Sequence, residues 1–147
     1  MEECNVLITS AGRRTCLVEG FKKALLSGGY SGKVVCLEMD KLSAALYLSD
    51  KYYIVPPATN GNYIDIVLDI CKKERIKLLV PSTDIELDVF ASKTEIFLNN
   101  KTRVLVSSPE TIRICNDKYQ SFIFFKKLNL NTPITAICQD KDAVNAV

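Results

Sequence analysis

The sequence contains no histidine, and this absence removes the side chain that most often acts as a general base near neutral pH. Hydrolysis by a serine–histidine–aspartate triad is therefore not expected within these 147 residues. Metal chemistry that depends on histidine ligands is not expected either.

Six cysteines are present, but no two of them are spaced as C-x-x-C. They are scattered along the chain, at Cys4, Cys16, Cys36, Cys71, Cys115 and Cys138. Most lie in or beside apolar segments, where a reduced cysteine behaves as a small hydrophobic residue. We therefore expect reduced, structural thiols, and neither a zinc site nor a disulfide framework.

No apolar run approaches the roughly 18 residues that a membrane-spanning helix needs. The net charge is only +2, with 24% charged residues, so the composition indicates neither a nucleic-acid partner nor an anionic membrane. The N-terminal MEECNVLITS is acidic before it is apolar, which is unlike a signal peptide. The cytoplasm is therefore the expected location, and the length suits one ordinary domain with its own core.

Apolar runs typical of strands alternate with segments of helical periodicity. The predicted strands cover residues 5–9, 33–38, 51–55, 77–81 and 103–107. The predicted helices between and after them include residues 43–48, a helix capped by Asn60 or Asn62, a turn and helix over 82–98, and a helix that starts at Pro109. This alternation predicts a three-layer α/β/α, Rossmann-like fold with a mostly parallel five-stranded sheet.

A short turn follows the first predicted strand, and ligands of such sheets gather at the carboxyl ends of strands. The turn consists of Ser10, Ala11, Gly12, Arg13 and Arg14. Gly12 permits close backbone approach, the amides that open the next helix face an anion, and the arginines can bind carboxylate or phosphate. The alternative is that Ser10 caps the helix and both arginines are solvated. Only one glycine of the G-x-G-x-x-G fingerprint is present, which disfavours an NAD-dependent enzyme.

Polar residues also follow two other predicted strands. Asp40 comes after the second strand, and Asp84 and Glu86 come after the fourth. Asp40 could accept hydrogen bonds from a hydroxylated ligand, whereas Asp84 and Glu86 could bind a cationic amine or another polar substrate group. The structural alternatives are that Asp40 begins a turn and that Thr83 and Glu86 form a capping box.

The order of several segments resembles the ATP-grasp superfamily. These segments are TSAGRR, ALYLSDKYYIVPP and SSPETIRICNDKY, followed by the pattern F-K-K-L-x-L-x-T-P. The chain is most similar to the branch that contains relatives of carbamoyl-phosphate synthase large chains and pyrrolysine-pathway ligases. The resemblance implies that residues 1–115 form the N-terminal pre-ATP-grasp domain, which helps to bind the acceptor substrate. It also implies that residues 116–147 begin an ATP-grasp domain that is truncated.

In this family the ATP-grasp domain holds ATP and magnesium and activates a carboxylate as an acyl phosphate, which an amine then attacks. The resemblance implies that Lys118 reaches the ATP phosphates, whereas the structural alternative is a surface lysine in a first helical turn, where the macrodipole disfavours it. It also implies that the turn from Ser10 to Arg14 faces the substrate and the phosphate end of the nucleotide. Asp84 and Glu86 fall in a loop that contributes substrate contacts.

The family's Lys-Pro strand, glycine-rich phosphate flap and Glu…Asn magnesium pair are not found in these 147 residues. We therefore expect the substrate-side domain of an ATP-dependent carboxylate–amine or carbamoyl-phosphate-synthase-like ligase. It should be inactive alone and bind no cofactor tightly. The implied partners are the missing ATP-grasp lobes, in cis or from a split gene, and small carboxylate and amine substrates.

The alternative function is a free-standing small-ligand-binding or interaction module without catalysis. Truncation would also leave Phe122, Phe124 and Phe125 as an exposed apolar patch, since a helix at this point normally packs on the missing lobe. Such patches promote self-association. We therefore expect a homodimer or a disordered C-terminal tail.

Overall fold

The computed structural model describes residues 2–137 and divides into two compact units, Met1–Val106 and Ser107–Val147. Cys138 and the rest of the C-terminal tail, for which disorder is one expectation, lie outside the described residues. No helix in the described part is both long and apolar enough to cross a membrane. The assignment of residues 1–115 and 116–147 to two domains of the family stays a prediction.

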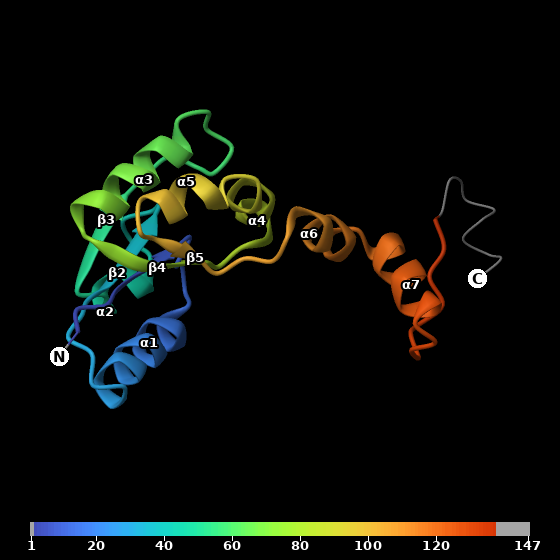
Figure 1. Ribbon diagram of the computed structural model, residues 1–147, viewed down its shortest axis with the longest axis horizontal. Coiled ribbons are helices and arrows are strands. Elements are labelled where there is room, and N and C mark those ends of the chain that lie inside the picture. Colours follow the sequence, from blue (N-terminus) through green and yellow to red (C-terminus); the bar gives the residue numbers. More distant parts are fainter. Residues whose placement is uncertain (1, 138–147) are drawn as a thin grey trace. The chain divides into compact units, whose positions relative to one another are not determined.

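The first unit is built on a five-stranded sheet whose strand order is β3-β2-β1-β4-β5 (Figure 1). All neighbouring strands pair in parallel. The strands are β1 (Asn5–Thr9), β2 (Val34–Glu38), β3 (Lys51–Ile54), β4 (Ile76–Pro81) and β5 (Arg103–Val104). The helices are α1 (Thr15–Ser27), α2 (Ala44–Leu48), α3 (Tyr63–Lys73), α4 (Asp84–Ala91) and α5 (Thr94–Asn99). The predicted fold class is thus confirmed.

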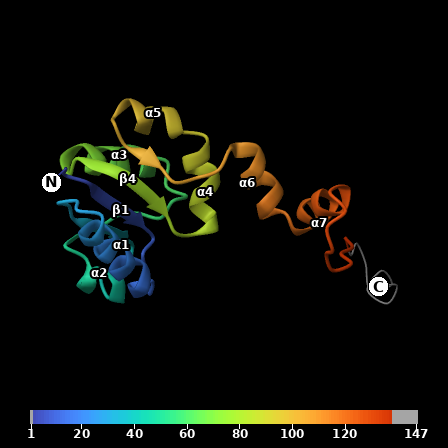
Figure 2. The same ribbon diagram turned by 60° about the horizontal axis from the view of Figure 1, so that its bottom comes forward.

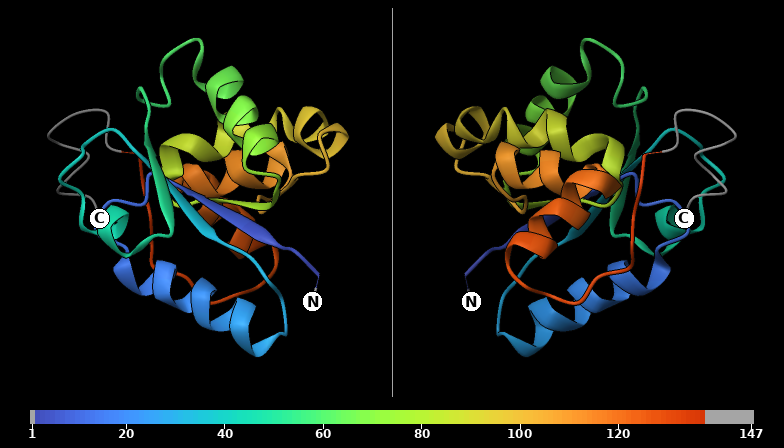
Figure 3. Two further views of the ribbon diagram at one scale, coloured as in Figure 1. Left: turned by 90° about the vertical axis from the view of Figure 1, so that its left-hand side faces the viewer. Right: turned by 90° about the vertical axis from the view of Figure 1, so that its right-hand side faces the viewer.

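Helices cover both faces of the sheet because alternate strand residues point to opposite sides. All five residues of β1 are buried. Leu7 packs in a cluster with residues of α3, α4 and α5, whereas Val6 and Ile8 pack in a second cluster with residues of α1 and α2. Figures 2 and 3 show these two helix layers on either side of the twisted sheet. A strand buried on both faces reads as a continuous apolar run, which is why β1 and β2 were predictable from the sequence.

The segment 82–98 differs from its prediction, because it forms two helices instead of one. The break lies at Ser92 and Lys93, between α4 and α5. Phe90 and Phe97 are both fully buried, with ring centroids 5.6 Å apart. Seven residues span about 10 Å along a continuous helix, so the break is what brings the two rings into one core.

Two other local predictions also change. The fifth strand is only Arg103–Val104, at the edge of the sheet, instead of residues 103–107. Asn62 does precede α3, but its side chain makes no capping bond; instead, Asn60 Oδ1 accepts a hydrogen bond from Asn62 N at 2.9 Å.

The second unit contains α6 (Pro109–Asn116) and α7 (Lys118–Lys127). Side chains cap both helices, and α6 starts at Pro109, as predicted. Ser108 Oγ accepts from Thr111 N at 3.2 Å, and Asp117 Oδ1 accepts from Tyr119 N and Gln120 N at 2.8 and 2.9 Å.

The five cysteines within residues 2–137 are free thiols. Cys36 and Cys71 are buried in the two core clusters, and burial raises their pKa values to about 11 and about 12, respectively. These two are structural, as expected. Cys16 and Cys115 are instead exposed, and Cys4 is half-buried.

Candidate functional site

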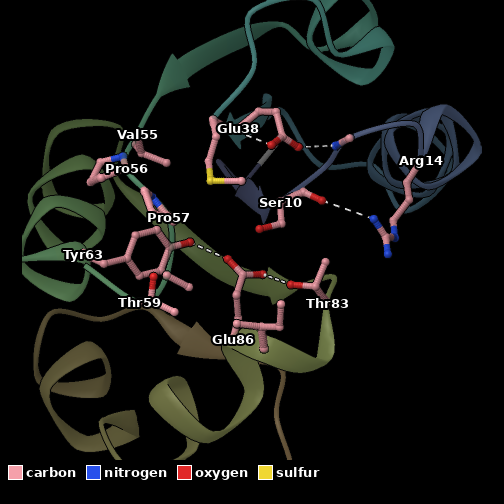
Figure 4. Close-up of a pocket in the computed structure, with 14 residues that line it drawn as sticks. Ser10, Arg14, Glu38, Val55, Pro56, Pro57, Thr59, Tyr63, Thr83 and Glu86 are labelled. Atoms are coloured by element: carbon pink, nitrogen blue, oxygen red, sulfur yellow. Dashed lines mark hydrogen bonds between the residues drawn. The ribbon is translucent and has the colours of Figure 1, made fainter. Parts of the chain in front are cut away.

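The strand order creates a switch point beside β1. The chain passes from β1 to β2 and β3 on one side and then returns to β4 on the other. At such a point the connections after the two central strands diverge, and ligands bind in the crevice outside their carboxyl ends. A cavity of about 440 Å³ opens there, lined by the segments that follow β1, β2, β3 and β4 (Figure 4).

Glu86 lies in the wall of this cavity and is fully buried. Thr9 Oγ1 and Thr83 Oγ1 donate to its Oε2 at 2.9 and 3.1 Å, and the Tyr63 hydroxyl donates to its Oε1. No ion pair to Glu86 is found in the described residues. The carboxylate therefore depends on three hydroxyl donors, contributed by β1, α3 and the start of α4.

Tyr63 is a stable donor in this cluster. Burial raises the pKa of Tyr63, and the nearby charge of Glu86 raises it further, so the phenol keeps its proton at physiological pH. Thr83 is the N-cap residue of α4, but its side chain bonds to Glu86 and not to the helix backbone. The predicted capping box is therefore incomplete, because Glu86 turns into the core.

The turn after β1 adopts a left-handed backbone at two residues, with φ of 46° at Ser10 and 51° at Gly12. Ser10 is not the helix cap: α1 is preceded by Arg14, and no side chain caps it. Two neighbouring strands hold the turn. Ser82 Oγ donates to the carbonyl of Ser10 at 2.8 Å, and Gly12 N donates to Glu38 Oε2 at 2.6 Å. Ala11, the remaining residue of the turn, is buried.

Both arginines of the turn line a neighbouring hollow of about 750 Å³, and Arg14 also lines the cavity. Arg14 is exposed at the rim of the cavity, and its Nη1 donates to the carbonyl of Ser10 at 3.3 Å. Most of its guanidinium donors thus stay free for a carboxylate or phosphate. Arg13 is also exposed, and it lines this hollow, together with Asp40, but not the cavity.

Asp40 and Asp84, which were also predicted, do not line this cavity. Asp40 Oδ1 accepts from Leu42 N at 2.9 Å, so it begins a turn as its structural alternative states. Asp84 is the exposed first residue of α4. Lys118 is the exposed first residue of α7, in the second unit. Their roles as substrate or ATP contacts stay predictions.

Three residues of the site were not singled out from the sequence, namely Thr9, Glu38 and Tyr63. Thr9 and Glu38 are the last residues of buried strands β1 and β2. A polar residue that ends an apolar run is a usable signal for them. Tyr63 carries no such signal, because it reads as an ordinary core residue of α3. Apolar residues after β3, among them Val55, Pro56 and Pro57, complete the wall.

Within the described part of the chain, no three cysteine or carboxylate side chains converge to hold a metal ion. Glu86 and Glu38 already use their oxygens on hydroxyl and amide donors. Each of these oxygens thus already has at least one hydrogen-bond donor as its partner.

Residues 6–105 match the model of a family described as PylC-like, N-terminal domain. No curated protein matches the sequence.

Several solved structures share the fold. The biotin carboxylase domain of a single-chain bacterial carboxylase is 17% identical, with a TM-score of 0.63, over 97% of this chain and 33% of its own. N5-carboxyaminoimidazole synthetase from Staphylococcus aureus, complexed with ADP, is 12% identical, with a TM-score of 0.63, over 99% of this chain and 36% of its own. The biotin carboxylase domain of Hydrogenobacter thermophilus 2-oxoglutarate carboxylase, complexed with MgADP and bicarbonate, is 16% identical, with a TM-score of 0.64, over 97% and 31%. The chain thus spans about a third of these structures.

Proposed function

The chain belongs to the family of PylC-like N-terminal domains, and from this membership we propose that it forms the substrate side of an ATP-dependent carboxylate–amine ligase. The reaction would proceed through an acyl phosphate that the amine attacks. The proposal includes a carbamoyl-phosphate-synthase-like reaction as an alternative that uses the same acyl-phosphate chemistry. The resemblance to the pre-ATP-grasp domain that the sequence indicates is confirmed at the level of family and fold.

The observation that carries the proposal is the cavity at the switch point. Its wall comes entirely from the unit Met1–Val106, most of which matches the family. Arg14 offers a forked cation to a carboxylate, the segment after β3 offers an apolar surface, and Tyr63 with Glu86 offers a buried polar contact. This combination suits a small carboxylate substrate with an apolar portion.

ATP and magnesium belong, in this proposal, to ATP-grasp lobes outside the described residues, either in cis or from a split gene. One observation supports this division: the chain covers 33% and 36% of the similar carboxylase and synthetase structures. Lys118, near the start of the second unit, is the residue that we expect to reach the ATP phosphates. The chain alone would then neither bind these cofactors tightly nor turn over.

The test is ADP release from ATP, with small carboxylates and amines, by the chain alone and joined to an ATP-grasp region. We expect activity only in the joined protein. Arg14→Ala should lower kcat/KM about 10- to 100-fold, as expected when a charged hydrogen bond to substrate is lost. Arg103→Ala, which removes an exposed arginine from β5, is the matched control and should leave kcat/KM unchanged. Turnover by the chain alone would contradict the proposal.

A binding module without catalysis is the second candidate, because the cavity and the neighbouring hollow that Arg13 lines need no residue from outside the first unit. It predicts that the chain alone binds a small carboxylate or nucleotide, and that Arg13→Ala abolishes this binding. Titration calorimetry measures the binding, and the ADP-release assay measures turnover. Strong binding by the chain alone, without turnover when an ATP-grasp region is joined to it, would favour the binding module.

A further inference from the structure

The turn after β1 already holds an anion that belongs to the protein. Glu38, the last residue of β2, has an exposed fraction of only 8%. Its Oε2 accepts from Gly12 N at 2.6 Å, and its Oε1 accepts from Met39 N at 2.8 Å. Figure 4 shows this carboxylate between the turn and the cavity.

The turn is fixed to its neighbours at further points, so Glu38 holds a rigid structure. Ala11 N donates to the carbonyl of Leu37 at 3.2 Å, and Ala45 N donates to the carbonyl of Gly12 at 3.0 Å. From the other side of β1, Ser82 holds the carbonyl of Ser10. Gly12 therefore presents its amide to Glu38 in a conformation that the surrounding strands and α2 determine.

This contact changes which ligands the crevice can accept. In a fold of this type, the amides after the first strand are where a phosphate or carboxylate of a ligand binds. An anion at Gly12 would have to displace Glu38 or lie against it, and two negative charges at such short range repel each other. Arg14, at the rim of the cavity, still has free donors for such an anion.

We propose that Glu38 determines the specificity of the crevice, by excluding anionic ligand groups from the Gly12 amide and confining them to Arg14. This inference rests on the proposed function in one respect: it takes the crevice as the site where the ligand binds. Neutral or cationic ligand groups fit beside Glu38, whose charge also reaches the hollow lined by Arg13. A phosphate of a nucleotide is thereby kept off the turn.

The experiment uses inorganic pyrophosphate as the probe and compares two variants of the whole chain by titration calorimetry. Glu38→Gln removes the negative charge at nearly constant volume, and Asp69→Asn removes an exposed charge of α3 that lines neither the cavity nor the neighbouring hollow. We expect Glu38→Gln to bind pyrophosphate at least about tenfold more tightly than the wild type, as one charge-assisted hydrogen bond allows. Asp69→Asn should bind pyrophosphate within about twofold of the wild type. Equal effects of both variants would overturn the proposal.

Nuclear magnetic resonance of the wild-type chain tests the proposal independently, and this test does not depend on whether the Glu38→Gln variant folds. Pyrophosphate should shift the side-chain signal of Arg14 and leave the amide signal of Gly12 in place. A shift at Gly12, or a shift at neither residue, would overturn the proposal. If these results hold while the joined protein releases no ADP, the proposed reaction is wrong and the role of Glu38 stands.

Discussion

At the scale of single residues, a buried carboxylate defines the wall of the cavity. Glu86 has no exposed surface and receives three hydroxyl hydrogen bonds, from Thr9, Tyr63 and Thr83. A buried charge is tolerated only when its oxygens are satisfied. The cluster also connects β1, α3 and α4 at the edge of the cavity, so it stabilises the fold and positions the site.

Removing this carboxylate should therefore cost more than removing one of its donors. We expect Glu86→Ala to lower the free energy of unfolding by about 2–4 kcal/mol, since it leaves buried hydroxyls unpaired and opens a cavity. Tyr63→Phe, which removes one donor, should lower it by about 1–2 kcal/mol. Urea unfolding monitored by circular dichroism measures both values. A loss below about 0.5 kcal/mol for Glu86→Ala would show that the cluster does not stabilise the fold.

At the scale of elements, the connection from α1 to β2 depends on the close approach of the N-terminal segment. Cys4 N donates to the carbonyl of Ser31 at 2.9 Å, and Ser31 N donates to the carbonyl of Glu2 at 3.0 Å. A side-chain carbon at Gly32 would lie 2.0 Å from the carbonyl oxygen of Cys4. At Gly20, in the middle of α1, a side-chain carbon would meet no atom within 4 Å beyond its chain neighbours and the backbone of its own helix.

These two glycines give a matched pair of variants. Gly32→Ala should lower the free energy of unfolding by about 2 kcal/mol or more, because the backbone of the N-terminal segment must move. Gly20→Ala should raise it by about 0.5–1 kcal/mol, because alanine favours the helix and meets no neighbour. Thermal unfolding of the two variants measures the effects. The same sign for both would contradict this account of the connection.

At the scale of the whole molecule, α7 presents apolar residues to solvent. No residue of this helix is buried, and the side chains of Phe124 and Phe125 are 43% and 42% exposed. Phe122 is half-buried, with the ammonium of Lys126 5.7 Å from its ring centroid. Exposed apolar groups of this kind favour association with another surface.

We therefore predict that the chain forms homodimers through α7. Light scattering coupled to size exclusion should give a dimer for the wild type and a monomer for the double variant Phe124→Ser, Phe125→Ser. Leu98→Ser, which changes a residue of α5 that is 65% exposed, is the control and should stay dimeric. A well-ordered wild-type monomer would refute the prediction.

The sequence by itself determined the layers of the fold and one part of the site. Apolar runs such as residues 5–9 are typical of strands buried on both faces, and their alternation with helices predicts a parallel sheet. The turn from Ser10 to Arg14 was predictable for the same reason, since it must lie where the first strand ends. The spacing of neighbouring residues is enough to predict these strands and this turn, without knowledge of contacts between distant residues.

The tertiary structure alone decided which polar groups meet. Tyr63 and Thr9 lie 23 and 77 residues from Glu86 in the sequence, and they join it only because β4 returns beside β1. In the same way, Glu38 reaches Gly12 because β2 pairs with β1, whereas Asp40, just beyond the strand, bonds locally to Leu42 N. The order of strands is set by packing across the whole sheet, and that packing has no local trace in the sequence.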